Sequence, residues 1–405
     1  MSTLFPFRAL RPAPGAVSRV ASVPYDVVNT DEARGLADGN PLSFLRVTRS
    51  EIDLPPDTSP YDAAVYETAV ANFASLRTSA PLVIEDEPSL YFYRLRMGGH
   101  EQTGLAGCFS VDEYERDLVK KHEKTRKDKE DDRTRHITEL RAQTGVVFLT
   151  YRALQPVAEI AARMATTPPL YDFTAPDGVA HTIWQVTGAD RDALVAAFAT
   201  LPAVYIADGH HRAASAARAR PALAATGDAG AAGRFIAVAF PDDQVQILPY
   251  NRTVKDLAGK TPETLLADLR ARFHVSDGDP APGRSGQVSM FLGGRWYSIV
   301  LPKPAPGVSR ADALDVEVLQ REILTPLLDV GDPRMDKRID FVGGIRGTAE
   351  LERLVTSGRA AVAFSLHPVG LDDLMTIADA GGIMPPKSTW FEPKLRDGVL
   401  THVIA

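Results

Sequence analysis

The stretch Val204–Arg218 constrains this chain more than any other. It begins with a short apolar run, Val204–Ala207, that is typical of a buried strand. The dipeptide Asp208-Gly209 is a turn signal, and the Ala-rich run over 213–220 consists of strong helix formers. The stretch therefore predicts a strand, a tight turn and a helix in immediate succession.

Four polar side chains stand at this join: Asp208, His210, His211 and Arg212. The first turn of a helix exposes backbone N–H groups and the positive end of the helix dipole, which together attract an anion. A cation such as Arg212 is unfavourable there unless an anion offsets it, so the pattern favours a phosphate site. A solvated helix cap explains the same residues equally well, because short motifs often match by chance. Zinc binding by the two neighbouring histidines is disfavoured, since adjacent His side chains rarely converge on one ion.

Composition narrows the classes of function. The chain has 405 residues, a net charge of −7 and one cysteine, Cys108. The length fits two or three domains, and the acidic charge gives no case for nucleic-acid binding. A lone cysteine excludes an intramolecular disulfide and fits a reducing compartment. No apolar run is long enough for a signal peptide or a membrane span, so we expect a cytoplasmic protein.

The alternation of apolar runs with helical patterns predicts a mixed α/β fold of the α+β class in two domains. The first domain, residues 1–255, contains the join and an insertion of helix, strands and helix near residues 152–202. The second, residues 256–405, is predicted to be a C-terminal α/β domain.

Local patterns also predict several elements within these domains. Strands are expected at 18–23 and 44–48, and a helix over 59–76 with Ser59 as its N-cap. A long helix is expected over 311–328.

Two carboxylates in the N-terminal part are candidates for catalysis. Asp26 stands where a strand meets a turn, which is a common place for a catalytic carboxylate. Glu51 lies among charges of both signs beside the next predicted strand. A turn or cap role is the alternative for Asp26.

Residues 113–143 are the most charged part of the chain and mix both signs. A solvated helix with i,i+4 ion pairs is the simpler interpretation. The alternative is a mobile segment that folds over a nucleotide and Mg²⁺, with Lys124 and Arg126 near the phosphates. Asn251 and Arg252, at the polar end of a predicted strand, are candidates for the same site or for a turn. The loop Met384–Lys394 suits a binding site or a C-terminal strap equally well.

Six motifs occur in order along the chain: Pro24-Tyr-Asp26, Lys121-His-Glu-Lys-Thr125, Lys129-Glu-Asp-Asp-Arg133, Ala207-Asp-Gly-His-His-Arg212, Pro249-Tyr-Asn-Arg252 and Met384-Pro-Pro-Lys-Ser-Thr389. Together they resemble a large bacterial and archaeal family of uncharacterised proteins. The Asp-Gly-x-His-Arg core also resembles the ParB/sulfiredoxin-like fold, which includes the free-serine kinases. The resemblance implies that His211 and Arg212 bind nucleotide phosphates, with Gly209 as the turn glycine and Asp208 as the preceding acid. The catalytic glutamate of those kinases has no secure match here, which leaves Asp26 and Glu51 as candidates.

The resemblance implies a small-molecule kinase that passes a phosphoryl group from ATP or ADP to the hydroxyl of free serine or a similar metabolite. Such transfer needs clamped phosphates, Mg²⁺ and an oriented hydroxyl. His210, His211 and Arg212 would form the clamp. Asp208 would bind Mg²⁺ or orient the hydroxyl, and Asp26 or Glu51 would be the base.

The main alternative is a ParB-like switch that binds or hydrolyses nucleotide without phosphotransfer to a metabolite. A DNA-associated regulator fits the acidic charge less well. We expect no membrane partner, and a homodimer is compatible with either function.

Overall fold

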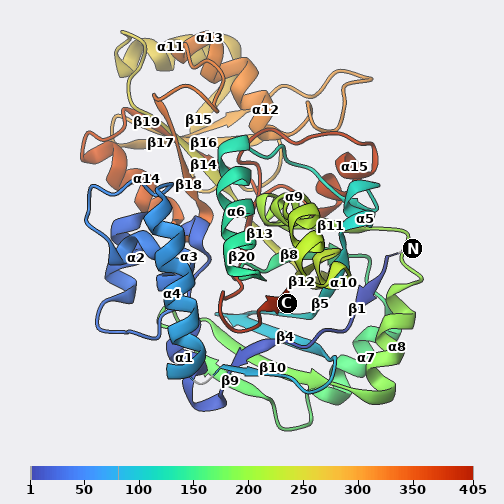
Figure 1. Ribbon diagram of the computed structural model, residues 1–405. Helices are drawn as coiled ribbons and strands as arrows, with labels where there is room; N and C mark the ends of the chain where they lie inside the picture. Colours follow the sequence, from blue (N-terminus) through green and yellow to red (C-terminus); the bar gives the residue numbers. More distant parts are fainter. Residues whose placement is uncertain (1, 81, 405) are drawn as a thin grey trace. The chain divides into compact units, whose positions relative to one another are not determined.

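The computed structural model describes residues 2–80 and 82–404, and the chain divides into two compact units (Figure 1). Unit 1 consists of Met1–Val245 and Pro393–Ala405, and unit 2 of Gln246–Glu392. The predicted boundary after residue 255 differs from this division. β13 (Gln246–Leu248) and β14 (Tyr250–Val254) pair with strands of unit 2, which is why they belong to it.

A mixed nine-stranded sheet forms the centre of unit 1, in the order β6-β11-β8-β12-β5-β4-β10-β9, with β1 beside β5. Its strands are β1 (Leu4–Phe5), β4 (Leu90–Met97), β5 (His100–Ser110), β6 (Val119–Lys120), β8 (Val147–Tyr151), β9 (Tyr171–Thr174), β10 (Ala180–Val186), β11 (Val204–Asp208) and β12 (Arg234–Pro241). β6 runs parallel to β11 and β12 runs parallel to β8, whereas the other pairs are antiparallel. The predicted insertion near 152–202 therefore extends this sheet, because its strands β9 and β10 continue from β4.

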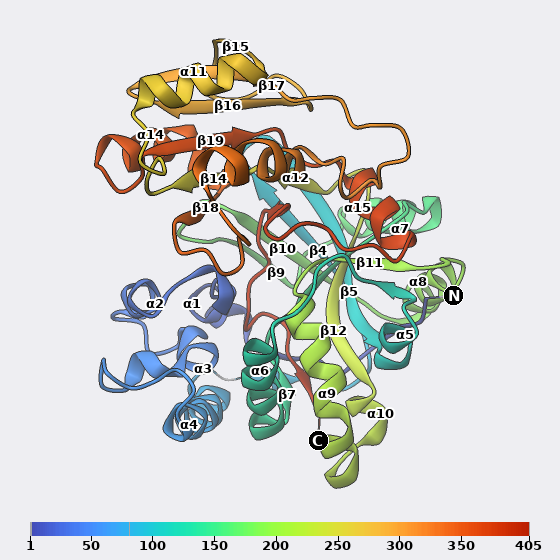
Figure 2. The same ribbon diagram turned by 90° about the horizontal axis from the view of Figure 1, so that it is seen from above.

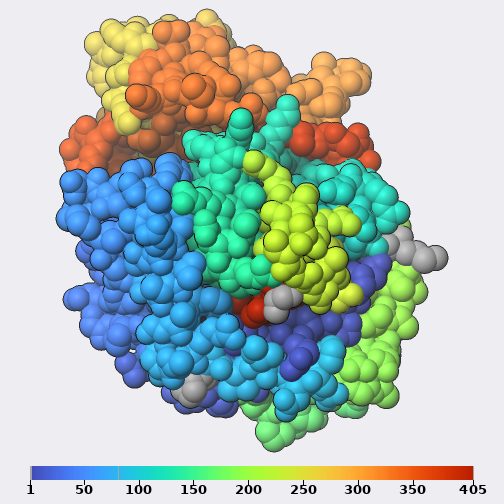
Figure 3. All heavy atoms as spheres, viewed as in Figure 1, coloured from blue at the N-terminus to red at the C-terminus, as the bar shows by residue number. Residues whose placement is uncertain are grey.

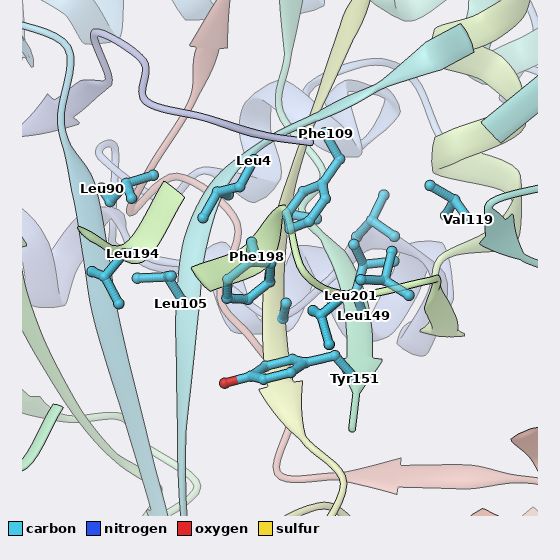
Figure 4. Close-up of a cluster of buried hydrophobic side chains, with 14 of the residues drawn as sticks. Leu4, Leu90, Leu105, Phe109, Val119, Leu149, Tyr151, Leu194, Phe198 and Leu201 are labelled. Atoms are coloured by element: carbon cyan, nitrogen blue, oxygen red, sulfur yellow. The ribbon is translucent and has the colours of Figure 1, made fainter. Parts of the chain in front are cut away.

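The main hydrophobic core of unit 1 lies between this sheet and helices α7 (Gln155–Met164) and α8 (Gly188–Phe198). Figure 4 shows Phe198 of α8 beside Phe109 of β5 and Tyr151 of β8, with ring centroids 6.2 and 4.8 Å from that of Phe198. Removing one such side chain from water stabilises the fold by roughly 1.5–3 kcal/mol. The apolar run of β11 joins this core, which fixes the position of the strand that leads into the join.

The two strands predicted near the N-terminus are wrong. Residues 17–20 form the single helical turn α1 (Val17–Val20), and residues 45–48 form α3 (Leu45–Thr48). Both pack with α4 (Ala63–Ser79) in a separate apolar cluster that includes Val20, Val47 and Phe73. Runs this short are compatible with the hydrophobic period of a helix and with that of a strand. Their packing on α4 decides in favour of helix.

Two predicted helices have different bounds from those expected. α4 begins at Ala63, and the N-cap is Asp62, which accepts a hydrogen bond from the N–H of Ala64, rather than Ser59. The helix predicted over 311–328 is split into α12 (Asp315–Leu319), a π-helical turn over Gln320–Leu324 and α13 (Thr325–Leu328).

Helices α6 (Lys127–Leu140) and α9 (His210–Thr226) lie side by side (Figures 1 and 2), and Figure 3 shows both at the surface of unit 1. α6 is not solvated on all sides: it buries Asp132, His136, Ile137 and Leu140. Ile137 packs against Ala219 and Leu223 of α9. The charged segment therefore contains a helix that packs firmly against α9. The mixed charges of its sequence give no indication of this packing.

The C-terminal end of the chain returns to unit 1. Asp397 pairs with Ser22, and Thr401 pairs with Leu10. β21 (His402–Val403) then pairs with β7 (Ala142–Gln143) next to α6. Because these backbone hydrogen bonds join positions far apart in sequence, the segment 393–404 straps unit 1 instead of completing the domain predicted for 256–405.

The remaining elements of unit 1 are short. They are β2 (Leu10–Pro12), β3 (Leu82–Ile84), α2 (Thr30–Ala37), α5 (Val111–Glu115), α10 (Ala229–Ala232) and the 3₁₀ turns Pro14–Ala16, Tyr25–Val27 and Ser50–Asp53. The turn Tyr25–Val27 carries Asp26.

Unit 2 contains a six-stranded sheet in the order β15-β17-β16-β19-β14-β18. Its further strands and helices are α11 (Pro262–Arg272), β15 (His274–Asp277), β16 (Gln287–Leu292), β17 (Arg295–Val300), β18 (Ile339–Gly343), α14 (Gly347–Thr356), β19 (Val362–Leu366), α15 (Leu371–Asp379) and β20 (Trp390–Glu392), with a 3₁₀ turn at Gly344–Arg346. Among the described residues of the whole chain, no helix is both long and apolar enough to cross a membrane.

Candidate active site

The join of β11 and α9 has the predicted strand-turn-helix form, and the helix begins at His210, before the Ala-rich run. Gly209 makes the turn with a φ of +95°, in the left-handed region that favours glycine. A Cβ at this position would lie 3.4 Å from the Cα of Val147 and 3.3 Å from the Cδ of Arg212. The strand therefore passes into the helix without a loop, and the first turn of α9 stands at the end of β11.

Asp208, the last residue of β11, is already paired with a cation. Its Oδ1 accepts a hydrogen bond from the N–H of Gly209 at 2.9 Å, and its Oδ2 lies 2.9 Å from the Nζ of Lys394. Burial alone would raise the pKa of Asp208, but Lys394 and Arg212 outweigh it and lower the pKa below its usual range. Lys394 thus supplies the positive charge that the sequence analysis expected from Mg²⁺.

Arg212 is directed into unit 1 and is only 6% exposed. Its Nη1 donates to the carbonyl of Val146 at 2.7 Å, and its Nη2 donates to both carboxylate oxygens of Asp26 at 2.6 and 2.8 Å. The side chain of Asp26 is 37% exposed. A buried guanidinium therefore holds a partly exposed carboxylate in a fixed position beside the first turn of α9.

Aromatic and cationic groups pack around this pair. The ring of Tyr25, next to Asp26 in the same turn, has its centroid 4.4 Å from the Cζ of Arg133 and 5.5 Å from that of Arg212. Arg133 in turn donates to the adjacent Asp132 at 2.7 Å, which also accepts from the hydroxyl of Tyr66 at 2.7 Å. The turn that carries Asp26 is thus fixed by α4 and α6.

Asp397 is a buried carboxyl group that the sequence analysis did not identify. It is 1% exposed, and its Oδ2 makes no hydrogen bond to described residues. Burial raises the pKa of Asp397 to about 7, although Arg212 opposes the shift and Asp26 adds to it. The only local signal is the turn dipeptide Asp397-Gly398, and nothing in the sequence places this turn beside Asp26.

The raised pKa of Asp397 predicts a pH-dependent loss of stability. The carboxyl is protonated in both states below about pH 4, but between about pH 4 and 7 only the folded state holds the proton. Stability therefore falls as the pH rises from about 4 to about 7 and levels off above that, by about 4 kcal/mol in all for a shift from 3.8 to about 7. Urea unfolding at pH 5 and pH 8 should show a larger loss for the wild type than for Asp397→Asn. Equal losses in the two proteins would contradict the assignment.

The two histidines of the join contact the loop that precedes α6. The backbone N–H of His122 donates to the Nε2 of His210 at 3.4 Å, and that of Arg126 donates to the Nε2 of His211 at 3.0 Å. Lys124 and Arg126 are exposed on this loop. Residues 121–126 therefore lie across the first turn of α9.

His122 and His210 are both buried, and their rings are perpendicular with centroids 4.4 Å apart. Burial lowers the pKa of His122 to about 4 and that of His210 well below its usual range. Both rings are therefore neutral at pH 7, and His210 does not add a positive charge to the join.

Three further candidates make contacts of their own. Glu51 is 5% exposed and forms an ion pair with Arg49 at 3.1 Å, which indicates a structural role. Asn251 and Arg252 lie in β14 of unit 2. Asn251 accepts from the N–H of Leu366 at 3.0 Å, and Arg252 donates to the carbonyls of Tyr250 and Pro386.

A small pocket of about 20 Å³ lies on the inner side of Arg212 and is lined by Tyr25, Arg133, His136 and Gly145 among others. A cavity of this size has room for roughly one water molecule.

The chain matches, over residues 4–321, the family described as "Protein of unknown function (DUF1015)". No curated protein matches the chain. Similar solved structures include a conserved hypothetical protein from Pyrococcus furiosus, 14% identical with a TM-score of 0.35, covering 72% of this chain and 93% of that one. SbnI from Staphylococcus aureus is 13% identical with a TM-score of 0.38, covering 72% and 85%. A free serine kinase in complex with AMP is 12% identical with a TM-score of 0.36, covering 72% and 91%. Likenesses this remote carry no inference about fold or activity.

Proposed function

The chain belongs to the DUF1015 family of proteins of unknown function, and on the geometry of its site we propose that it is a nucleotide-dependent phosphotransferase. The acceptor is the hydroxyl of free serine or of a similar small metabolite, and the donor is ATP or ADP. The observation that carries the proposal is the Asp26–Arg212 pair: a partly exposed carboxylate is held by a buried guanidinium next to the N-terminus of α9.

The phosphates are proposed to bind at the first turn of α9. The N–H groups of Arg212 and Ala213 are bonded to the carbonyl of Gly209 within the helix. The positive end of the dipole of a helix as long as α9 lies at this turn and attracts phosphate oxygens. Lys124 and Arg126, exposed on the loop across this turn, add positive charge.

Asp26 is proposed to accept the proton of the acceptor hydroxyl. Its rival Glu51 is buried against Arg49, so a substrate hydroxyl has poorer access to it. Arg212 is not proposed as a direct phosphate ligand, because its two Nη atoms already bond to Val146 and Asp26. It acts by fixing the position of Asp26 at the site of transfer.

In this proposal Mg²⁺ binds to the phosphates of the nucleotide. Asp208 fits it poorly, because the ammonium of Lys394 occupies one carboxylate oxygen and the N–H of Gly209 the other. Mg²⁺ commonly keeps several waters and binds through phosphates with few protein ligands. When bound, it would neutralise the charge that develops on the transferred group.

The test is a panel of hydroxyl-bearing metabolites incubated with the protein, Mg²⁺ and either ATP or ADP, with phosphorylated products identified by mass spectrometry. Free serine is the first compound to try. Nucleotide binding without any phosphorylated product would replace this proposal with a nucleotide-dependent switch. If calorimetry detects no nucleotide binding, both the phosphotransferase and the switch are ruled out.

We also predict that nucleotide orders the loop 121–126 more than α6. The loop exposes Lys124 and Arg126, whereas α6 is already packed through Ile137 and Leu140. Hydrogen exchange with and without ATP and Mg²⁺ should show added protection over 121–126 and little change over 130–140. Unchanged exchange in the loop of a protein that binds nucleotide would place the phosphates elsewhere.

A further inference from the structure

The ring of His122 has an unusual hydrogen-bonding state. His122 is 2% exposed and donates a hydrogen bond to the carbonyl of Ile206 on β11. Its Nδ1 is buried and has no hydrogen-bond partner among the described residues. The ring therefore donates through Nε2 and presents the Nδ1 lone pair to the protein interior. A buried acceptor without a donor costs roughly 1–3 kcal/mol, and a ligand on this nitrogen would offset that cost.

Two further side chains that can ligate a metal lie close to His122. One ligand atom from each of His122, Glu123 and His210 lies within 4.8 Å of the others. The Nδ1 of His210 is 3.9 Å from a carboxylate oxygen of Glu123, whose side chain is 41% exposed. The cluster thus has two buried rings and one carboxylate near the surface, through which an ion can enter.

We propose that His122, Glu123 and His210 bind a divalent transition-metal ion, with zinc as the best fit. Two imidazoles and one carboxylate form a ligand set that zinc uses with an open fourth position. The hydrogen bond from the His122 ring to Ile206 is the outer contact that usually fixes the orientation of a metal-bound histidine.

The ligand atoms of the three side chains are farther apart in this structure than they would be around a bound metal ion. Ligand atoms on one tetrahedral zinc ion lie about 3.4 Å apart, as follows from bonds of about 2.0–2.1 Å. The side chain of Glu123 is 41% exposed, whereas the rings of His122 and His210 are buried, so closing this gap would require a shift of Glu123. The hydrogen bond from the N–H of His122 to His210, at 3.4 Å, is long and is lost at little cost if His210 turns to the metal.

Such an ion would lie at the first residue of α9, next to the proposed phosphate site. Its double positive charge exceeds the single negative charge of Glu123, so it would add to the attraction for anions there. The metal site goes beyond the proposed phosphotransfer, because it rests on His122 and its neighbours and does not depend on nucleotide.

The test is metal binding by the full-length protein after treatment with a chelator. Zn²⁺ content per chain is measured after dialysis, and Co²⁺ is titrated as a spectroscopic probe of a site with nitrogen and oxygen ligands. We expect one ion per chain. Glu123→Gln should weaken Co²⁺ binding at least about tenfold, and His122→Gln about a hundredfold or more. Gln at 122 retains a donor for Ile206 but lacks the Nδ1 lone pair.

Two control variants distinguish this site from others. His274→Gln alters an exposed histidine on β15 and should leave binding unchanged. His211→Gln should also retain the metal; if it alone abolishes binding, the adjacent pair is the ligand set and the proposal fails. Melting curves identify any variant that is unfolded, and Glu123→Gln decides the matter if His122→Gln does not fold. A wild type without stoichiometric metal, or a folded Glu123→Gln that binds like the wild type, overturns the site.

Discussion

Asp26→Asn is expected to lower kcat for the proposed phosphotransfer by about 10²–10⁴-fold while nucleotide affinity stays nearly unchanged. Asn preserves the shape of the side chain and one oxygen for Arg212, but it cannot accept the hydroxyl proton. A base that acts only in the transition state affects turnover and not ground-state binding. The measurement is steady-state turnover with the acceptor found in the metabolite panel, together with calorimetry of nucleotide binding.

Glu51→Gln is the matched control. Glu51 is buried in an ion pair with Arg49 and accepts a hydrogen bond from the hydroxyl of Thr30, so its replacement should lower stability and leave turnover per folded molecule unchanged. Should Glu51→Gln lose turnover while Asp26→Asn keeps it, the two roles are exchanged. Full turnover in both variants places the base elsewhere.

Arg212→Ala is expected to lower the free energy of unfolding by about 3 kcal/mol, near the lower limit for breaking a buried ion pair because Asp26 is partly exposed. From the sequence, Arg212 was predicted to belong to a phosphate clamp. The structure buries it instead, with bonds to Val146 and Asp26. Urea unfolding of wild type and variant measures the difference.

Arg218→Ala on the same helix is the control for this prediction. Its side chain is 40% exposed and pairs with Glu130 and Asp131 at the surface of α6. Exposed pairs contribute roughly 0–1 kcal/mol, so the change in stability should be much smaller than for Arg212→Ala. A loss of similar size in the two variants would show that Arg212 is no more important to the fold than a surface arginine.

Sequence patterns correctly predicted those elements whose conformation depends on residues close to them in the sequence. The apolar run at Val204, the turn at Gly209 and the Ala-rich helix lie within one stretch, so propensity and turn chemistry agree there. Thr261 and Pro262 likewise mark the start of α11: the side chain of Thr261 accepts a hydrogen bond from the N–H of Thr264, and Pro262 stands in the first turn, both of which follow from local residue preference.

The same reasoning failed where a run was too short to show a period. Val17–Val20 and Leu45–Thr48 contain residues that favour strands, yet each forms one helical turn. Contacts with Phe73 and Leu76 of α4 decide their conformation. Tertiary packing overrides weak local propensity in segments of this length.

The sequence by itself determined that Asp208, His210, His211 and Arg212 gather where a strand becomes a helix. Only the tertiary structure decided their partners. Lys394 and Asp397 reach the join because the C-terminal end pairs with Ser22 and Leu10, and His122 reaches His210 because β6 lies beside β11. The physical reason is that charge pairing and burial depend on distance in space, whereas a linear pattern records only distance along the chain.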